Sequence, residues 1–232
     1  MSQTFSIGML LFPGLTHLDL TGPHEIFSRM PNTKISLVAE AMAPVLAERG
    51  LAFLPDYPLH DSPKFDLLFV PGGTGVNAVM ENEEILSWLK NRAKTAKYVT
   101  SVCTGSLALA SAGLLDGYSA TTHWLSLDVL RLFPRINVKE DRIVRDGNRI
   151  TGGGVTAGID FALSVAGDLH GANIAQEIQL MLEYDPNPPF FAGHPRSAPK
   201  EIVNSVESSR REAQIKRKEI ALRAIDRLKS EK

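Results

Sequence analysis

The chain has 232 residues, of which 44% are hydrophobic and 22% are charged, and its formal net charge at pH 7 is −1. This balanced, core-forming composition argues against nucleic-acid and membrane-surface partners, and no apolar run approaches the roughly 20 residues of a membrane-spanning helix. The lone cysteine excludes an internal disulfide, and the first residues form no basic or apolar leader, so we expect a cytoplasmic protein.

Short apolar runs and amphipathic runs alternate through the first half of the chain. The apolar runs are typical of strands buried on both faces of a parallel sheet, and the amphipathic runs are typical of helices. Thr21 and Pro23 are expected to open the first helix. The alternation predicts an α/β fold with a doubly wound, mostly parallel sheet. The predicted strands are 5–12, 35–39, 66–70 and 98–102, with shorter ones over 44–60, and the predicted helices are 21–30, 83–96 and 107–112.

A hairpin and two helices are expected next. Two strand-like segments, 142–145 and 148–151, flank Asp146-Gly147, which is a strong signal for a tight two-residue turn. An apolar helical pattern then covers 156–169, and a further helical pattern continues to about Tyr184.

The chain changes character at Asp185. The proline-rich segment 185–195 is incompatible with regular structure, and 201–232 has the pattern of one long charged helix. Its basic and acidic residues alternate, which is more typical of a solvated helix than of a nucleic-acid-binding arm. We therefore expect a catalytic domain over 1–190 and a helical extension over 191–232, docked on the body or on a partner subunit.

Cys103 lies where a strand-like run breaks into a helix-like one. A sharp strand-to-helix turn lifts one side chain over the carboxyl edge of a sheet, and the pattern predicts a nucleophile elbow with sulfur in place of oxygen. The N–H groups at a helix N-terminus favour negative charge, so the thiol is expected to ionise more easily than a free cysteine. The alternative is a small buried residue between strand and helix.

Two other segments follow predicted strands at the same sheet edge, where ligands bind in open parallel sheets. Asp19 is flanked by leucines, and a carboxyl group in apolar surroundings has a raised pKa and a proton to give. Alternatively, Asp19 caps the helix that begins at Thr21. The amides of Gly72 and Gly73 could face a developing negative charge, or simply form a tight turn.

Other motifs carry less information. His123 could serve as a base or as an orienting group, although an isolated histidine is more often structural. The six histidines and one cysteine show no metal-ligand spacing. Pro71–Gly75 lacks the lysine of a phosphate-binding loop, and Gly152–Gly154 lacks the spacing of a dinucleotide fingerprint.

Motif-bearing segments are spread over nearly the whole chain. They are Leu10–Pro13, Leu18–Pro23, Val70–Gly75, Tyr98–Ser106, Thr121–Trp124, Thr151–Phe161 and Leu182–Tyr184 with Pro188–Phe190. Together these segments resemble the ThiJ/PfpI superfamily and, within it, the bacterial isocyanide hydratases. The resemblance implies a flavodoxin-like sandwich with a small hairpin and a long C-terminal helix. It also implies a homodimer that converts an isocyanide to an N-formamide without a metal or organic cofactor.

The resemblance also implies roles for individual residues. Cys103 corresponds to the nucleophile and Asp19 to the general acid and base. Thr104 and the amides of Gly72 and Gly73 correspond to groups that line the site. Val155 corresponds to a residue that forms part of the wall of the site near the sulfur. The family position of Val155 can hold isoleucine, so valine there could alter the volume of the pocket.

Several alternatives remain open at this stage. A protease of the superfamily would usually carry histidine directly after the cysteine, where this chain has Thr104. A glyoxalase-like relative commonly places glutamate, not aspartate, near the thiol. AraC-type regulators have a similar elbow but add a DNA-binding domain, for which the residues after Tyr184 leave no room. A stand-alone small-molecule sensor and a redox sensor acting through Cys103 are the remaining candidates.

Overall fold

The computed structural model describes residues 4–230, and its centre is a seven-stranded sheet in the order β10-β11-β7-β6-β1-β2-β5. All neighbours in this sheet pair in parallel except β10, which forms an antiparallel hairpin with β11. The strands are β1 Phe5–Leu10, β2 Thr33–Ala39, β3 Val45–Leu46, β4 Ala52–Phe53, β5 Tyr57–Pro58, β6 Leu67–Val70, β7 Tyr98–Val102, β8 Ser119–Ala120, β9 Asn137–Val138, β10 Ile143–Asp146 and β11 Arg149–Gly152. The predicted doubly wound, mostly parallel α/β fold is thus confirmed.

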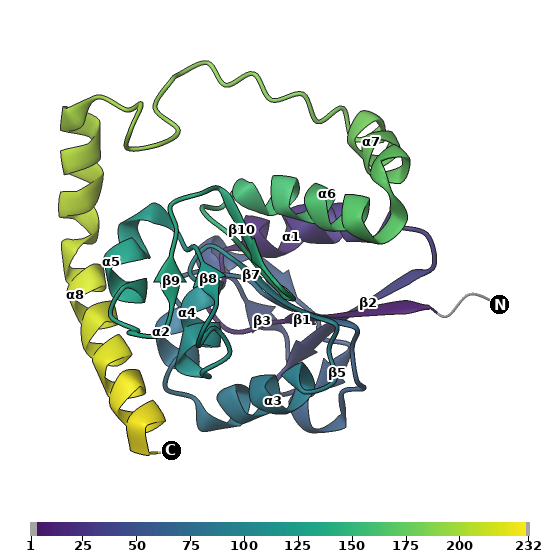
Figure 1. Ribbon diagram of the computed structural model, residues 1–232, viewed down its shortest axis with the longest axis horizontal. Coiled ribbons are helices and arrows are strands. Elements are labelled where there is room, and N and C mark those ends of the chain that lie inside the picture. The colour runs from purple at the N-terminus through teal and green to yellow at the C-terminus, as the bar shows by residue number, and fades with distance from the viewer. Residues whose placement is uncertain (1–3, 231–232) are drawn as a thin grey trace.

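Helices cover both faces of the sheet, as Figure 1 shows. Helices α1, α6 and α7 lie on one face, and α3 and α4 lie on the other. The helices are α1 His17–Phe27, α2 Val76–Val79, α3 Glu83–Ala93, α4 Gly105–Ser111, α5 Leu127–Leu130, α6 Ala157–His170, α7 Ala172–Met181 and α8 Lys200–Ser230. Segment 185–199, between α7 and α8, has no helix or strand, as its prolines predicted.

An aromatic cluster holds α1 and α6 against the sheet. Phe27 of α1 contacts Phe69 of β6 and Phe161 of α6 edge-on, with ring centroids 6.4 and 6.1 Å apart. All three side chains are almost completely buried, and each such ring contributes roughly 1.5–3 kcal/mol through burial. This packing holds the end of α1 against β6 and α6, and at the other end of α1 Asp19 lies beside Gly72.

Helix α1 begins at His17, so the prediction that it opens at Thr21 was wrong. Pro23 lies inside the helix rather than in its first turn, where it removes only the N–H that would bond the carbonyl group of Asp19. A β-carbon on Gly22 would lie 3.2 Å from Ile159 of α6, so close packing against α6 stabilises this stretch as helix. Asp19 therefore lies within the first turn of α1 and does not cap a helix that starts after it.

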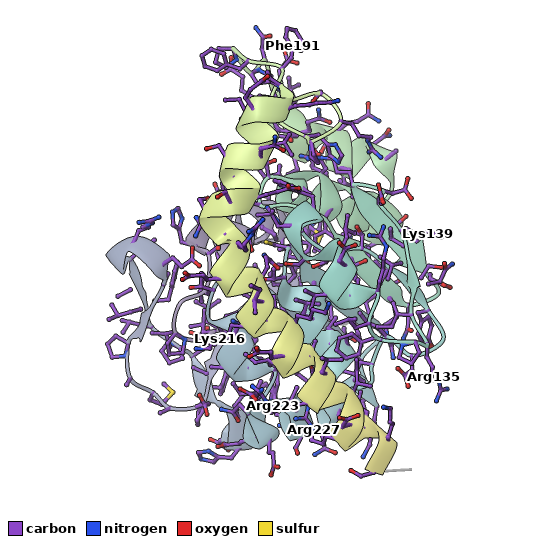
Figure 2. All side chains as sticks on the ribbon, turned by 90° about the vertical axis from the view of Figure 1, so that its left-hand side faces the viewer. Arg135, Lys139, Phe191, Lys216, Arg223 and Arg227 are labelled. Atoms are coloured by element: carbon purple, nitrogen blue, oxygen red, sulfur yellow. The ribbon has the colours of Figure 1, made fainter. Side chains whose placement is uncertain are left out.

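Helix α8 runs along the outside of α4 and α5 (Figures 1 and 2). Its buried side chains are Arg217, Ile220, Ala221, Ala224 and Ile225. Not every apolar residue of the helix packs against the body, because Ile215 and Leu222 are 54% and 46% exposed. Alanines complete the packed face instead, since their small side chains let the helix approach the body. The last two residues of the predicted helix lie outside the described residues.

Within residues 4–230, no helix combines the length and the apolar character needed to cross a membrane.

Candidate active site

Cys103 occupies a strained turn between β7 and α4. Its φ angle is 53°, in the left-handed region that residues other than glycine rarely adopt. Two tertiary hydrogen bonds hold this conformation: the amide of Cys103 donates to Gly152 O at 3.1 Å, and the Thr122 hydroxyl donates to Cys103 O at 3.0 Å. The strand-to-helix turn predicted at Cys103 is therefore present, and the thiol is 5% exposed.

Asp19 reaches the same place from the first turn of α1. Its side chain is fully buried, and Oδ2 accepts a hydrogen bond from the amide of Gly72 at 3.0 Å. Oδ1 has no regular hydrogen-bond partner among the described residues. Burial raises the pKa of Asp19 to about 7, although the interaction with Cys103 and the Gly72 amide oppose the shift. The direction of this shift is the one that the apolar surroundings predicted.

The carboxyl group of Asp19 and the thiol of Cys103 form a coupled pair. The two groups interact electrostatically. They also interact as hydrogen-bond donor and acceptor, although their geometry is not that of a regular hydrogen bond. Burial raises the pKa of Cys103, and the negative charge of Asp19 raises it further. The expected easy ionisation of the thiol was therefore wrong. The Thr104 amide and the charge of Arg217 do lower the pKa of Cys103, but burial outweighs them.

Gly72 and Gly73 hold the other side chains of the site in place. The amide of Gly73 donates to the Thr104 hydroxyl at 3.0 Å, and that of Gly72 is taken by Asp19. The amide of Gly72 therefore faces the carboxyl group of Asp19, and the amide of Gly73 holds the Thr104 side chain. A β-carbon on Gly72 would lie 2.5 Å from the Thr104 nitrogen and 2.8 Å from Asp19 Oδ2, so only glycine fits.

A cavity of about 230 Å³ opens onto the sulfur. Of the residues singled out from sequence, Gly73, Cys103, Thr104, His123 and Val155 line it, whereas the fully buried Asp19 does not. The remaining lining residues are Thr16, Glu48, Thr74, Leu125, Arg210, Ala213, Gln214 and Arg217.

His123 is a neutral wall of this cavity. Its Nδ1 accepts a hydrogen bond from the Leu125 amide at 3.3 Å, and burial together with the charges of Arg217 and Arg210 lowers its pKa to about 4. Nδ1 is therefore unprotonated and occupied, which leaves only Nε2 available to a ligand. The described residues contain no group of three histidine, cysteine or acidic side chains that could hold a metal ion.

Sequence reasoning missed Glu48 and the α8 residues of the cavity. Arg210, Gln214 and Arg217 come from the charged helix that the sequence presented as solvated. Glu48 comes from a short helical turn after β3. Nothing in the local sequence around these residues signals a site, because it is tertiary packing that brings them to Cys103.

The chain is similar to several known proteins. Residues 5–167 match the model of the DJ-1/PfpI family. The chain is 47% identical to an isonitrile hydratase of Pseudomonas putida over 97% of this chain and 99% of that one. It is 36% identical to the HTH-type transcriptional regulator GbdR of Pseudomonas aeruginosa over 78% of this chain, but only 51% of the regulator is covered.

Solved structures show the same fold. A ThiJ/PfpI family protein from Pseudomonas syringae superposes with a TM-score of 0.91 at 44% identity, covering 94% of this chain and 90% of the other. Drosophila melanogaster DJ-1beta superposes with a TM-score of 0.71 at 27% identity, covering 78% of this chain and 98% of the other. The chain therefore belongs to the DJ-1/PfpI family, also called the ThiJ/PfpI family.

Proposed function

We propose that the protein is an isocyanide hydratase, a cofactor-independent enzyme that adds water to an isocyanide and releases the N-formamide. The observation that carries the proposal is the buried Asp19–Cys103 pair at a small cavity. The nearly full-length similarity to an isonitrile hydratase supports it. The pair supplies a soft nucleophile and a carboxyl group able to give and take a proton at neutral pH, and this reaction needs both.

The first step uses one proton shared by the pair. Because Asp19 titrates near pH 7 and the pKa of Cys103 lies well above its usual range, the pair holds a single proton above about pH 7. When that proton moves from sulfur to the carboxylate, the thiolate attacks the terminal isocyanide carbon and a C–S bond forms. Asp19 then protonates the same carbon, which gives a thioimidate and restores the carboxylate.

The second step releases the product. The Asp19 carboxylate takes a proton from water as the water oxygen bonds to the thioimidate carbon, and Asp19 then passes this proton to the nitrogen. The C–S bond breaks, the hydroxyl proton of the intermediate moves to the Asp19–Cys103 pair, and the neutral formamide leaves. Sulfur suits both steps because it is a soft nucleophile and a good leaving group.

The remaining predicted residues act around this pair. Gly72 and Thr104 orient it, the first through the hydrogen bond to Asp19 and the second through its amide at the sulfur. Gly73 fixes the Thr104 hydroxyl, and Val155 limits the space beside Cys103. We further propose that the enzyme acts as a cytoplasmic homodimer, for which light scattering should give twice the monomer mass.

Turnover of p-nitrophenyl isocyanide tests the proposal. Wild-type protein should consume it catalytically. Cys103→Ala should lose turnover and Asp19→Asn should lose most of it, while both keep the circular dichroism spectrum of the folded protein. Folded wild-type protein that does not hydrate this or other small isocyanides would overturn the assignment.

The similarity to GbdR favours one alternative, a stand-alone sensor that binds a small molecule in the same cavity without turning it over. Thermal stabilisation of the wild type by an isocyanide that it does not consume would support the sensor. Catalytic loss of the isocyanide would exclude that role as its sole function.

A further inference from the structure

Arg217 is an unusual residue for an outer helix. It is only 6% exposed, and its guanidinium donates from Nε to Asn77 Oδ1 at 2.9 Å and from Nη1 to the Ser126 hydroxyl at 3.0 Å. Both partners are neutral, and within residues 4–230 no carboxylate forms an ion pair with it. A buried charge without a counter-charge is costly, so its compensation has to come from the cavity that it lines beside Cys103.

The charges around the cavity come from two separate parts of the chain. Helix α8 contributes the cations Arg210 and Arg217, and the body contributes Glu48 and the single negative charge of the Asp19–Cys103 pair. Glu48 is fixed there, because it accepts hydrogen bonds from the Thr74 amide at 2.6 Å and from the Thr16 hydroxyl at 3.4 Å. His123 is neutral, so the three charges of Arg210, Arg217 and Glu48 set the field of the cavity lining across the pair.

Arg217 and Glu48 act on opposite ends of the Asp19–Cys103 pair. Arg217 acts on the sulfur end of the pair, where its positive charge lowers the pKa of Cys103. Glu48 acts on the other end, where its negative charge raises the pKa of Asp19. Both charges therefore favour the arrangement with the proton on Asp19 and the negative charge on sulfur.

We propose that Arg217 and Glu48 are positioning residues that polarise the Asp19–Cys103 pair, so that docking of α8 completes the active site. The proposal rests on the proposed function for its catalytic meaning. In the step it promotes, the S–H bond of Cys103 breaks, an O–H bond forms on Asp19, and the negative charge moves from the carboxylate to the sulfur beside the guanidinium. Arg217 lies beyond residues 5–167, so the part that matches the family model lacks this charge.

The test follows the thiolate itself, independently of any isocyanide. The rate of Cys103 alkylation by iodoacetamide is measured between pH 6 and pH 10 in the full-length protein. Arg217→Met should lower the rate at pH 7.5, because loss of the positive charge raises the pKa of Cys103 further and reduces the thiolate population. Glu48→Gln, which keeps an acceptor for the Thr74 amide, should lower it in the same direction. Arg217→Lys keeps the charge and should restore most of the rate.

A matched control separates charge from helix docking. Arg227 lies on the same helix and donates to Met80 O and Ser111 O at 3.2 and 3.1 Å, away from the cavity. Arg227→Gln should change thermal stability while leaving the alkylation profile unchanged. If Arg217→Met and Glu48→Gln keep the wild-type profile, or if Arg227→Gln shifts it equally, the proposal is wrong. Because alkylation needs no isocyanide, a failure of the proposed function would appear separately, as absent turnover with a shifted profile.

Discussion

The shared proton of Asp19 and Cys103 predicts a specific pH dependence of hydration. Below the pKa of about 7 for Asp19, both groups carry a proton, so no carboxylate is available to take the thiol proton. Above that value the pair holds one proton and is competent. The second proton is lost only well above the usual range of a thiol, because burial and the charge of Asp19 raise the pKa of Cys103.

The expected magnitudes follow from the ionised fraction of Asp19. With a pKa of about 7, kcat/KM should fall to roughly one tenth of its plateau at pH 6 and to about one hundredth at pH 5. The plateau should extend beyond about pH 9, since the pair then still keeps the proton that must reach the isocyanide carbon.

Initial rates of p-nitrophenyl isocyanide loss between pH 5 and pH 10 measure this profile. The residual activity of Asp19→Asn at high enzyme concentration serves as the control and should lack the limb near pH 7. A limb near pH 4 would mean that Asp19 titrates like an exposed carboxyl group. A rate that begins to rise only at pH 9 or above would mean that the thiol ionises alone. Either result would refute the shared-proton reasoning.

Three further substitutions test the architecture. Asp19→Asn should stabilise the folded protein at pH 8 by about 4 kcal/mol, measured in denaturant melts. Folding raises the pKa of Asp19 from 3.8 to about 7, so the ionised carboxylate destabilises the folded state. This destabilisation is absent below pH 3.8, grows as the pH rises and is complete above about pH 7. Equal stability of both proteins at pH 8 would contradict this. Gly72→Ala should cost about 1–3 kcal/mol and most activity, because its β-carbon would meet a backbone nitrogen at 2.5 Å; an unchanged melting temperature would count against that clash. Thr122→Val should cost about 1 kcal/mol, since it removes the hydroxyl that holds the Cys103 carbonyl, and full stability would mean that the bond is dispensable.

Periodicity and turn residues were sufficient to predict the sheet, the hairpin and the elbow. These features depend on short-range patterns, such as the apolar run of β6 or the turn at Gly147, that tertiary contacts do not override. The start of α1 was misplaced because Pro23 favours a first turn locally, whereas packing of Gly22 against α6 decides the outcome. Arg217 was missed for a similar reason, since whether a charged residue of a helix faces solvent or a cavity depends on how the helix docks.

The error about the thiol shows which physical effect dominates in this site. A helix N-terminus stabilises a nearby negative charge by typically 0.3–1 kcal/mol, which is less than one pKa unit, whereas full burial can shift a pKa by up to 3–5 units. The sequence reveals the turn that places Cys103 at the start of α4. It does not reveal that Cys103 is only 5% exposed, and this burial raises the pKa of the thiol instead of lowering it. A buried thiol that is protonated at rest forms thiolate mainly by passing its proton to Asp19.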